Sequence, residues 1–270
     1  MKLGISTASL FNKAETVQAP ALFRSMGVDT AELFLNTFSE YEPAYISAIK
    51  EQADENGLSV YSVHPMSVQF EAQLFSSHKG QKADAMALYK KVLEAGQRLG
   101  ASHYTMHGAL QLVGDPGTTR NHRLQKLADT LDELTDAAAE RGIRLCLENV
   151  SWCFYKTPEM GLALREKLGA GKLKFVLDIK QAVRCGQDPF AFMEAVGEDI
   201  ETVHLCDYAH GEDGLKLKMP GEGEFDFVRM KEVLEKKGSP CAAFIEVYSD
   251  MYTGFSELEK CYKNLKKVLA

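Results

Sequence analysis

Short apolar runs alternate along this chain with longer stretches in which apolar residues recur at helical spacing. The apolar runs, which predict strands, cover residues 2–7, 29–35, 58–64, 102–107, 143–149, 173–178, 201–207 and 241–247. The stretches of helical period cover residues 16–26, 44–56, 82–99, 120–141, 158–168, 188–197, 225–237 and 256–269. Gly100, Gly142 and Gly238 stand where three of these helices should end.

Eight strand–helix units in 270 residues, about 34 residues each, indicate an α/β fold of the (β/α)8 TIM barrel type. Near-continuous apolar strands fit a parallel sheet that is buried on both faces. An open doubly wound sheet is the structural alternative, but no G-x-G-x-x-G follows the first strand. No linker rich in Pro, Gly or Ser divides the chain, so we expect one domain over residues 1–270.

Polar residues stand at or near the ends of the last six predicted strands. Barrels of this type carry their chemistry at the carboxyl ends of the strands, where these side chains should converge. Any one of them could simply cap a helix or satisfy a loop, but together they favour a functional site. They are His64, His107, Glu148, Asp178, His204 and Glu246.

The three carboxylates among these residues would repel one another at a shared barrel mouth. Each pair at about 4 Å costs roughly 4 kcal/mol at an effective dielectric constant near 20. Since the strand ends supply His204 but no cation, we expect a divalent metal ion held by Glu148, Asp178, His204 and Glu246. Mixed oxygen and nitrogen ligands suit Mn²⁺ best, while Mg²⁺, Co²⁺ and Zn²⁺ also fit.

Composition limits the partners that the protein can have. The formal net charge of −7 lacks the basic surplus of a nucleic-acid-binding protein, and no apolar run is long enough for a membrane span. The first residues read as a strand rather than a secretion signal. Six cysteines without a C-x-x-C pair indicate buried thiols in a reducing compartment. We therefore expect a cytoplasmic protein that acts on a small molecule.

Five motifs resemble a known family. They are LENV at 147–150, LDIKQA at 177–182, VHLCD at 203–207, MPGEGEFDF at 219–227 and FIEV at 244–247. The set is similar to the xylose isomerase-like TIM barrels, which include sugar phosphate isomerases and epimerases, inosose isomerase, ketose 3-epimerases and endonuclease IV. The resemblance implies a metal site at the four residues named above. It also implies that Glu148 and Glu246 face opposite sides of a sugar as the catalytic acid/base pair.

Departures from the family pattern reduce the number of functions that the resemblance allows. Many members have a His where this chain has Gln181, and the nuclease branch has an Asp-x-His where this chain has Lys216-Leu217-Lys218. The three-metal cluster of the nucleases should therefore not assemble. His64 and His107 match two further nuclease ligands, but without the remaining ligands we expect them to line the substrate pocket.

Four more residues are candidate substrate contacts. Gln181 would meet a substrate hydroxyl, and Lys216 and Lys218 would meet a carboxylate, phosphate or sugar oxygen unless they are simply solvated. Trp152 either forms an apolar wall against a sugar ring or packs its loop against a neighbour. The Pro220–Gly223 segment should set the turn into the helix at 225–237.

The leading functional hypothesis is a divalent-metal-dependent isomerase or epimerase of a sugar, sugar phosphate or cyclitol, acting through an enediolate. A lyase of the inosose dehydratase type needs the same first proton abstraction. An apurinic-site endonuclease is disfavoured by the net charge and by the missing nuclease ligands. A non-catalytic sugar-binding protein is the remaining alternative, and pairing into a homo-oligomer is left open.

Overall fold

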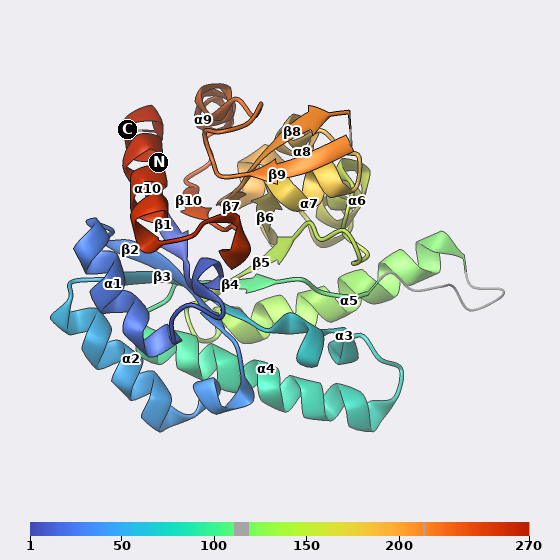
Figure 1. The fold of residues 1–270 in the computed structure, drawn as a ribbon. Coiled ribbons are helices and arrows are strands. Elements are labelled where there is room, and N and C mark those ends of the chain that lie inside the picture. The colour runs from blue at the N-terminus through green and yellow to red at the C-terminus, as the bar shows by residue number, and fades with distance from the viewer. Residues whose placement is uncertain (111–118, 213, 270) are drawn as a thin grey trace.

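Eight parallel strands close into a barrel in the order β1-β10-β7-β6-β5-β4-β3-β2, as the sequence predicts (Figure 1). The computed structural model describes residues 1–110, 119–212 and 214–269. The barrel strands are β1 (Lys2–Ser6), β2 (Thr30–Leu35), β3 (Ser59–Pro65), β4 (His103–Met106), β5 (Arg144–Glu148), β6 (Lys174–Asp178), β7 (Ile200–Leu205) and β10 (Ala242–Ile245). Each predicted strand matches one of them, and the TIM barrel prediction is confirmed.

Helices follow the strands around the barrel. The eight predicted helices correspond to α1 (Ala19–Met26), α2 (Pro43–Glu55), α4 (Lys79–Leu99), α5 (Arg120–Ala139), α6 (Pro158–Leu168), α8 (Pro189–Val196), α9 (Phe227–Lys236) and α10 (Phe255–Leu269). Gly100 ends α4 in the left-handed region, at φ 78°, which a residue without a side chain adopts at little cost. None of the helices in the described part of the chain is long and apolar enough to cross a membrane.

Several short elements were not predicted from the sequence. They are the helices α3 (Glu71–Leu74) and α7 (Ile179–Arg184), and the 3-10 turns η1 (Thr7–Leu10), η3 (Phe38–Tyr41), η4 (Ser67–Gln69), η5 (Gly197–Asp199) and η6 (Ser249–Met251). The 3-10 turn η2 (Thr16–Gln18) occupies the first residues of the helix predicted over 16–26. Most of them follow the carboxyl end of a barrel strand, so they shape the face on which the candidate site lies.

The segment after β7 contains two strands that were not predicted from the sequence. It forms an antiparallel pair of strands, β8 (Asp207–Gly211) and β9 (Gly214–Lys218), which stands apart from the barrel sheet (Figure 1). The alternation of Leu and Lys over residues 215–218 is the period-two pattern of a strand that is buried on one side, and Leu217 packs against the core. The many glycines around it obscured that short signal.

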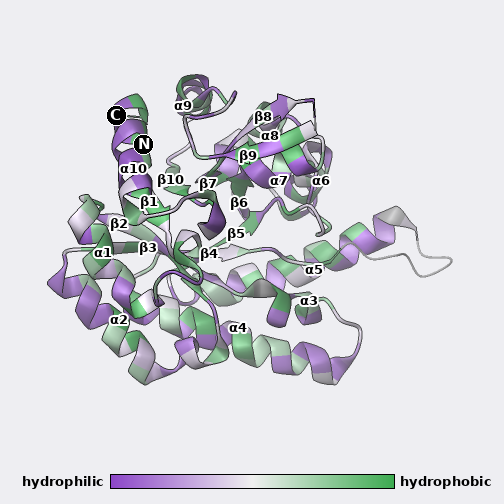
Figure 2. Cartoon of the chain, in the orientation of Figure 1, coloured by the Kyte–Doolittle hydropathy of each residue, from purple (hydrophilic) through white to green (hydrophobic). Residues whose placement is uncertain are grey.

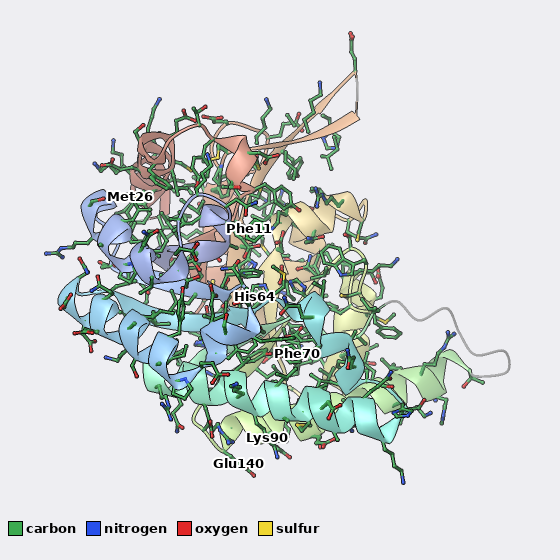
Figure 3. All side chains as sticks on the ribbon, turned by 60° about the horizontal axis from the view of Figure 1, so that its bottom comes forward. Phe11, Met26, His64, Phe70, Lys90 and Glu140 are labelled. Carbon is green, nitrogen blue, oxygen red and sulfur yellow. The ribbon has the colours of Figure 1, made fainter. Side chains whose placement is uncertain are left out.

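The helices present polar residues outward and apolar residues to the barrel, and both colours band each long helix in Figure 2. In Figure 3, His64 lies towards the middle of the molecule, whereas Lys90 and Glu140 lie at its edge. The buried core nevertheless contains many charged and polar side chains. Buried charges are costly unless they are paired, so their clustering at the strand ends marks the site described next.

Candidate active site

The four side chains predicted to bind a metal come together at the carboxyl end of the barrel. Glu148 ends β5, Asp178 ends β6, His204 lies in β7, and Glu246 follows β10 directly. These four strands are neighbours in the order β10-β7-β6-β5. One potential ligand atom from each residue lies within 4.8 Å of all the others. The geometry is therefore that of a compact site for one cation.

His204 is the centre of this cluster and is fully buried. Its Nδ1 lies 3.1 Å from Glu246 Oε2, 3.3 Å from Glu148 Oε1 and 3.7 Å from Asp178 Oδ2. Burial alone would lower the pKa of His204, but the surrounding carboxylates, Glu246 first, raise that pKa well above its ordinary value. Without a metal ion, the imidazole supplies positive charge to the cluster.

Glu32, in the middle of β2, belongs to the site although the sequence analysis missed it. Its Oε1 lies 3.0 Å from His204 Nε2, and the hydroxyl groups of Ser6, Ser62 and Thr105 donate hydrogen bonds to its two oxygens. Burial would raise the pKa of Glu32, but His204 lowers it to about 2. The only sequence signal was a single acidic residue inside the apolar run TAELFL.

Lys180 corrects our inference that the strand ends supply no cation. This residue lies at the start of α7, two positions after Asp178, and its side chain is only 4% exposed. Its Nζ donates a hydrogen bond to Glu246 Oε1 at 2.7 Å and another to Asp178 Oδ2. Burial would lower the pKa of Lys180, but Asp178 and Glu246 raise it well above the ordinary value. An ammonium group thus lies among the predicted metal ligands.

Asp178 is held from several sides. Its Oδ1 accepts a hydrogen bond from the backbone nitrogen of Gln181 and caps α7, and its backbone pairs with the Asn149 side chain. The side-chain oxygen of Gln181 accepts hydrogen bonds from the backbone nitrogen and the hydroxyl of Ser151. That oxygen is therefore engaged in joining two loops, so the predicted substrate contact of Gln181 would have to come from its amide nitrogen.

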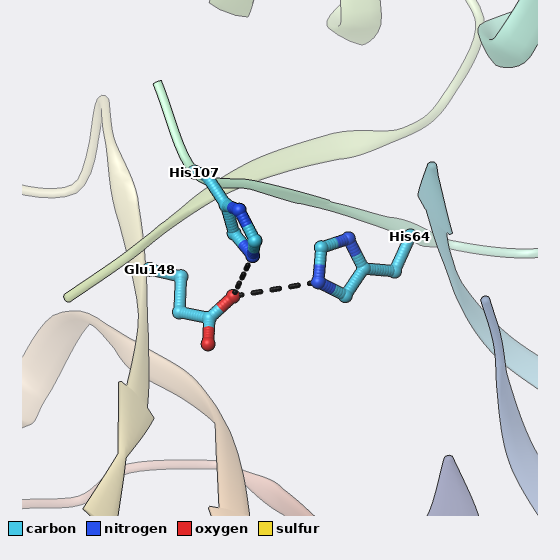
Figure 4. Close-up of side chains that lie close together, drawn as sticks. All are labelled: His64, His107 and Glu148. Atoms are coloured by element: carbon cyan, nitrogen blue, oxygen red, sulfur yellow. Dashed lines mark ion pairs between the residues drawn. The ribbon is translucent and has the colours of Figure 1, made fainter. Parts of the chain in front are cut away.

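His64 and His107 both contact Glu148 (Figure 4). The Nε2 of His107 lies 3.0 Å from Glu148 Oε2, and the Nε2 of His64 lies 3.4 Å from the same oxygen. His107 is 15% exposed in its side chain, whereas His64 is buried. Burial would raise the pKa of Glu148, but His107 and His204 hold it well below its ordinary value. Of the two imidazoles we expected in the substrate pocket, His107 is therefore the accessible one.

Trp152 lies at the rim of the site. The residue is 41% exposed, and its ring meets the His107 ring edge to face, with 5.7 Å between the centroids. An exposed indole next to an accessible imidazole favours the apolar wall over the loop-packing alternative. Lys216 and Lys218 lie on β9, in register with Ala209 and Asp207 of β8. Contact of these lysines with a substrate stays a prediction.

The residues present fit a divalent metal ion. Buried oxygens of Glu148 and Glu246, the Oε2 atom in each case, face imidazoles but accept no hydrogen bond from the described residues. Four carboxylates, those of Glu32, Glu148, Asp178 and Glu246, lie around the side chains of Lys180 and His204. Oxygen and imidazole donors in this number can hold a hard or borderline cation.

The closed parallel barrel, with carboxylates and imidazoles at its strand ends, makes this chain a TIM-barrel protein. The sequence identifies its family within that fold. The sequence model of the xylose isomerase-like TIM barrel family matches residues 20–267, so the chain belongs to that family. No curated protein sequence matches the chain.

Solved structures share the fold at low sequence identity. D-Psicose 3-epimerase from Clostridium cellulolyticum H10, solved with D-tagatose, superposes with a TM-score of 0.80 at 17% identity, covering 100% of this chain and 99% of that one. The IOLI protein with a bound zinc atom gives 0.80 at 17% identity over 100% and 98% of the two chains. The probable 3-DHS dehydratase AsbF of Bacillus anthracis gives 0.75 at 13% identity over 98% and 99%. At these identities the likeness establishes the fold alone.

Proposed function

We propose that this protein is a divalent-metal-dependent isomerase or epimerase that acts on a sugar, sugar phosphate or cyclitol through an enediolate. The observation that carries the proposal is the placement of two glutamates on either side of one cluster. Glu148 and Glu246 come from β5 and β10, with β6 and β7 between them. A substrate bound over Asp178 and His204 would therefore have one carboxylate at each side.

Two opposed carboxylates suit proton transfer at a carbon next to a carbonyl group. One glutamate accepts the proton as the C–H bond breaks, and the electron pair of that bond forms the carbon–carbon double bond of the enediolate. The other, as the carboxylic acid, returns a proton to carbon, and the double-bond electrons form the new C–H bond. Positioned acids and bases of this kind contribute about 10²- to 10⁴-fold in rate.

Glu148, Asp178, His204 and Glu246 would hold the metal ion. When bound, the ion stabilises the negative charge that develops on the substrate oxygens. His204 would offer Nδ1, because its Nε2 faces Glu32. Mn²⁺ is our first choice from the donor set, and the zinc described for the IOLI structure makes Zn²⁺ the second.

Around this centre, Trp152 and His107 would line the substrate pocket, and Gln181, Lys216 and Lys218 would make polar contacts. His64 would contribute through Glu148, because it is buried behind that contact. We propose that the protein works in the cytoplasm, where its six unpaired cysteines would stay reduced. Pairing of two chains would be compatible with this site.

Solvent deuterium exchange tests the proposal. Free and phosphorylated ketoses and inososes are incubated in deuterated buffer with Mn²⁺, and their masses are followed. We expect one substrate class to gain one deuteron with the wild type, and Glu246→Gln to lose that exchange. Glu232→Gln, on the exposed surface of α9, is the matched control and should exchange as the wild type does. Exchange that persists in Glu246→Gln would remove this residue from the proton transfer.

A lyase is the second candidate, and the likeness to the probable dehydratase AsbF favours keeping it. Elimination would start from the same abstracted proton and continue with loss of a hydroxyl group from the next carbon. Product mass separates the two reactions. Isomerisation or epimerisation leaves the mass unchanged in ordinary water, whereas dehydration lowers it by one water molecule.

A further inference from the structure

Lys180 is a buried cation in a place where a metal ion is expected. Its ammonium group bridges Asp178 and Glu246, which come from strands on opposite sides of β7 in the barrel. The side chain is 4% exposed, so water screens the ammonium group little. A metal ion bound to Asp178 and Glu246 would lie close to this positive charge.

The carboxylates of Glu246 and Asp178 differ in the number of oxygens that remain available to bind a metal ion. Glu246 gives Oε1 to Lys180 and turns Oε2 towards His204 Nδ1 at 3.1 Å, so one oxygen remains for a metal. Asp178 has no available oxygen of this kind, because its Oδ1 accepts the hydrogen bond from the Gln181 backbone nitrogen at 2.8 Å. Its Oδ2 is bonded to Lys180 and is also the oxygen that faces His204. At Asp178, the lysine and a metal ion would share one atom.

We propose that Lys180 is a tethered cation that neutralises the site in the metal-free protein and competes with a divalent metal ion for Asp178. Metal binding then requires the ammonium group to withdraw from Asp178 Oδ2, and the affinity for metal is lower than the four ligands alone would give. The long, flexible stem of lysine permits such a withdrawal. This inference rests on the metal site of the proposed function.

The role of Lys180 follows from the balance of charge. Glu148, Asp178 and Glu246 converge within the reach of one cation, and Lys180 is the only lysine or arginine among the described residues for which ion pairs to two of them are seen. Without it, His204 would be the one positively charged group among the described residues that contacts both Asp178 and Glu246. Lys180 thus holds the site assembled when no metal is present.

Metal affinity of single variants tests the proposal. The wild type, Lys180→Gln and the control Lys263→Gln are stripped of metal and titrated with Mn²⁺ and Zn²⁺ by calorimetry. Lys263 is an exposed lysine of α10 paired with Glu259, so its replacement removes the same charge far from the site. We expect the dissociation constant of Lys180→Gln to fall about ten- to a hundredfold. Lys263→Gln should bind as the wild type does.

Thermal unfolding supplies a readout that does not depend on activity. Metal-free Lys180→Gln should unfold at a lower temperature than the metal-free wild type, and saturating Mn²⁺ should raise its unfolding temperature by more. If Lys180→Gln does not fold without metal, Lys180→Met and amine-selective acetylation of the wild type replace it. Metal should then increase the acetylation of Lys180, read by peptide mass spectrometry.

The outcomes separate this inference from the proposed function. Equal or weaker metal binding by Lys180→Gln, or acetylation of Lys180 that metal leaves unchanged, overturns the competition while the metal site stands. If neither protein binds a divalent metal, the metal site of the proposed function fails and the inference fails with it. Tighter binding confined to the Lys180 variants supports the inference even if every tested sugar proves inert.

Discussion

His204 Nε2 lies 3.0 Å from Glu32 Oε1, while the Nδ1 of the same ring faces the carboxylates of Glu148 and Glu246. The two nitrogens therefore have separate partners. The 3.0 Å contact at Nε2 is an ion pair without hydrogen-bond geometry, whereas Nδ1 forms a hydrogen bond with Glu148 Oε1 at 3.3 Å. The negative charge of Glu32 on the Nε2 side favours the ring orientation in which Nδ1 is directed into the site.

Replacing Glu32 with Gln should weaken metal binding by about ten- to a hundredfold, because it removes the charge that orients His204. The amide keeps the shape of the side chain, and the hydroxyl groups of Ser62 and Thr105 can reverse their hydrogen bonds to it. The fold should therefore survive, as circular dichroism would check. Calorimetric titration with Mn²⁺ measures the change.

Ser47→Ala is a suitable control for the Glu32 variant, since it removes a hydroxyl hydrogen bond on the surface of α2, outside the barrel. It should leave the metal affinity unchanged. Wild-type affinity in a folded Glu32→Gln protein would mean that packing alone orients His204.

The barrel could be predicted from the sequence because its signals are repetitive. Each strand is an apolar run of four to seven residues, and each is followed by a helix. The hairpin β8–β9 was missed because its alternation spans only Leu215 to Lys218. The four residues predicted to bind a metal could be singled out because they stand at or near the ends of strands that become neighbours in the closed barrel.

The remaining site residues could not be found from local pattern. Glu32 lies within an apolar strand, and only closure of the barrel brings it to His204, 172 positions later. Lys180 lies next to Asp178 in the sequence, but a lysine at the start of a helix usually points into solvent. Its burial follows from the approach of Glu246 from β10, which is a tertiary contact.

Removal of metal should lower the unfolding temperature of the wild type. A ligand at a hundred times its dissociation constant stabilises the folded state by about 2.7 kcal/mol. For a domain of this size, that corresponds to an increase in unfolding temperature of about 5 °C. Differential scanning fluorimetry of chelator-treated protein, with Mn²⁺, Mg²⁺, Co²⁺ or Zn²⁺ added back, measures it. An unfolding temperature that none of the four ions raises contradicts a metal site.

Glu71 should make stability depend on pH. This residue is buried at the start of α3, and its carboxylate accepts hydrogen bonds from the Tyr104 hydroxyl and from the backbone nitrogens of His107 and Gly108. Burial, opposed by His107 and these hydrogen bonds, raises the pKa of Glu71 to about 7 from its ordinary 4.5. The folded protein thus holds this proton more tightly than the unfolded chain does.

The contribution of Glu71 to the free energy of unfolding should therefore fall as pH rises from about 4.5 to 7, by on the order of 3 kcal/mol. Glu71→Gln has no carboxyl group at this position, so its free energy of unfolding should not show this decrease. The free energy of unfolding of Glu71→Gln minus that of the wild type should therefore increase between pH 5 and pH 8. Urea unfolding at several pH values measures the difference. The exposed variant Glu222→Gln should show none. A constant difference between Glu71→Gln and the wild type would place the pKa of Glu71 near its ordinary value.

Asp207 ties the hairpin β8–β9 to the turn that precedes α9. Its Oδ1 accepts hydrogen bonds from the backbone nitrogens of Tyr208 and Phe225, and its Oδ2 accepts them from Gly221 and Gly223. The turn at Pro220–Gly223 is thus set by a buried carboxylate as well as by its own residues. Asp207→Ala would leave four donors without this acceptor and should cost about 3 to 5 kcal/mol of stability.

Substitution of Gly223 tests the contact between the Asp207 carboxylate and the turn at Pro220–Gly223 from the side of the turn. A Cβ at this position would lie 2.2 Å from the Tyr208 carbonyl oxygen and 2.4 Å from Asp207 Oδ1, so Gly223→Ala must displace the turn from the carboxylate. Its loss of stability should approach that of Asp207→Ala, and the double variant should lose less than the sum of the two because both break one set of hydrogen bonds. Gly254→Ala, where the nearest atom is 3.9 Å away, is the control. Urea unfolding of the four variants decides, and strictly additive losses would mean that the two residues stabilise the turn independently.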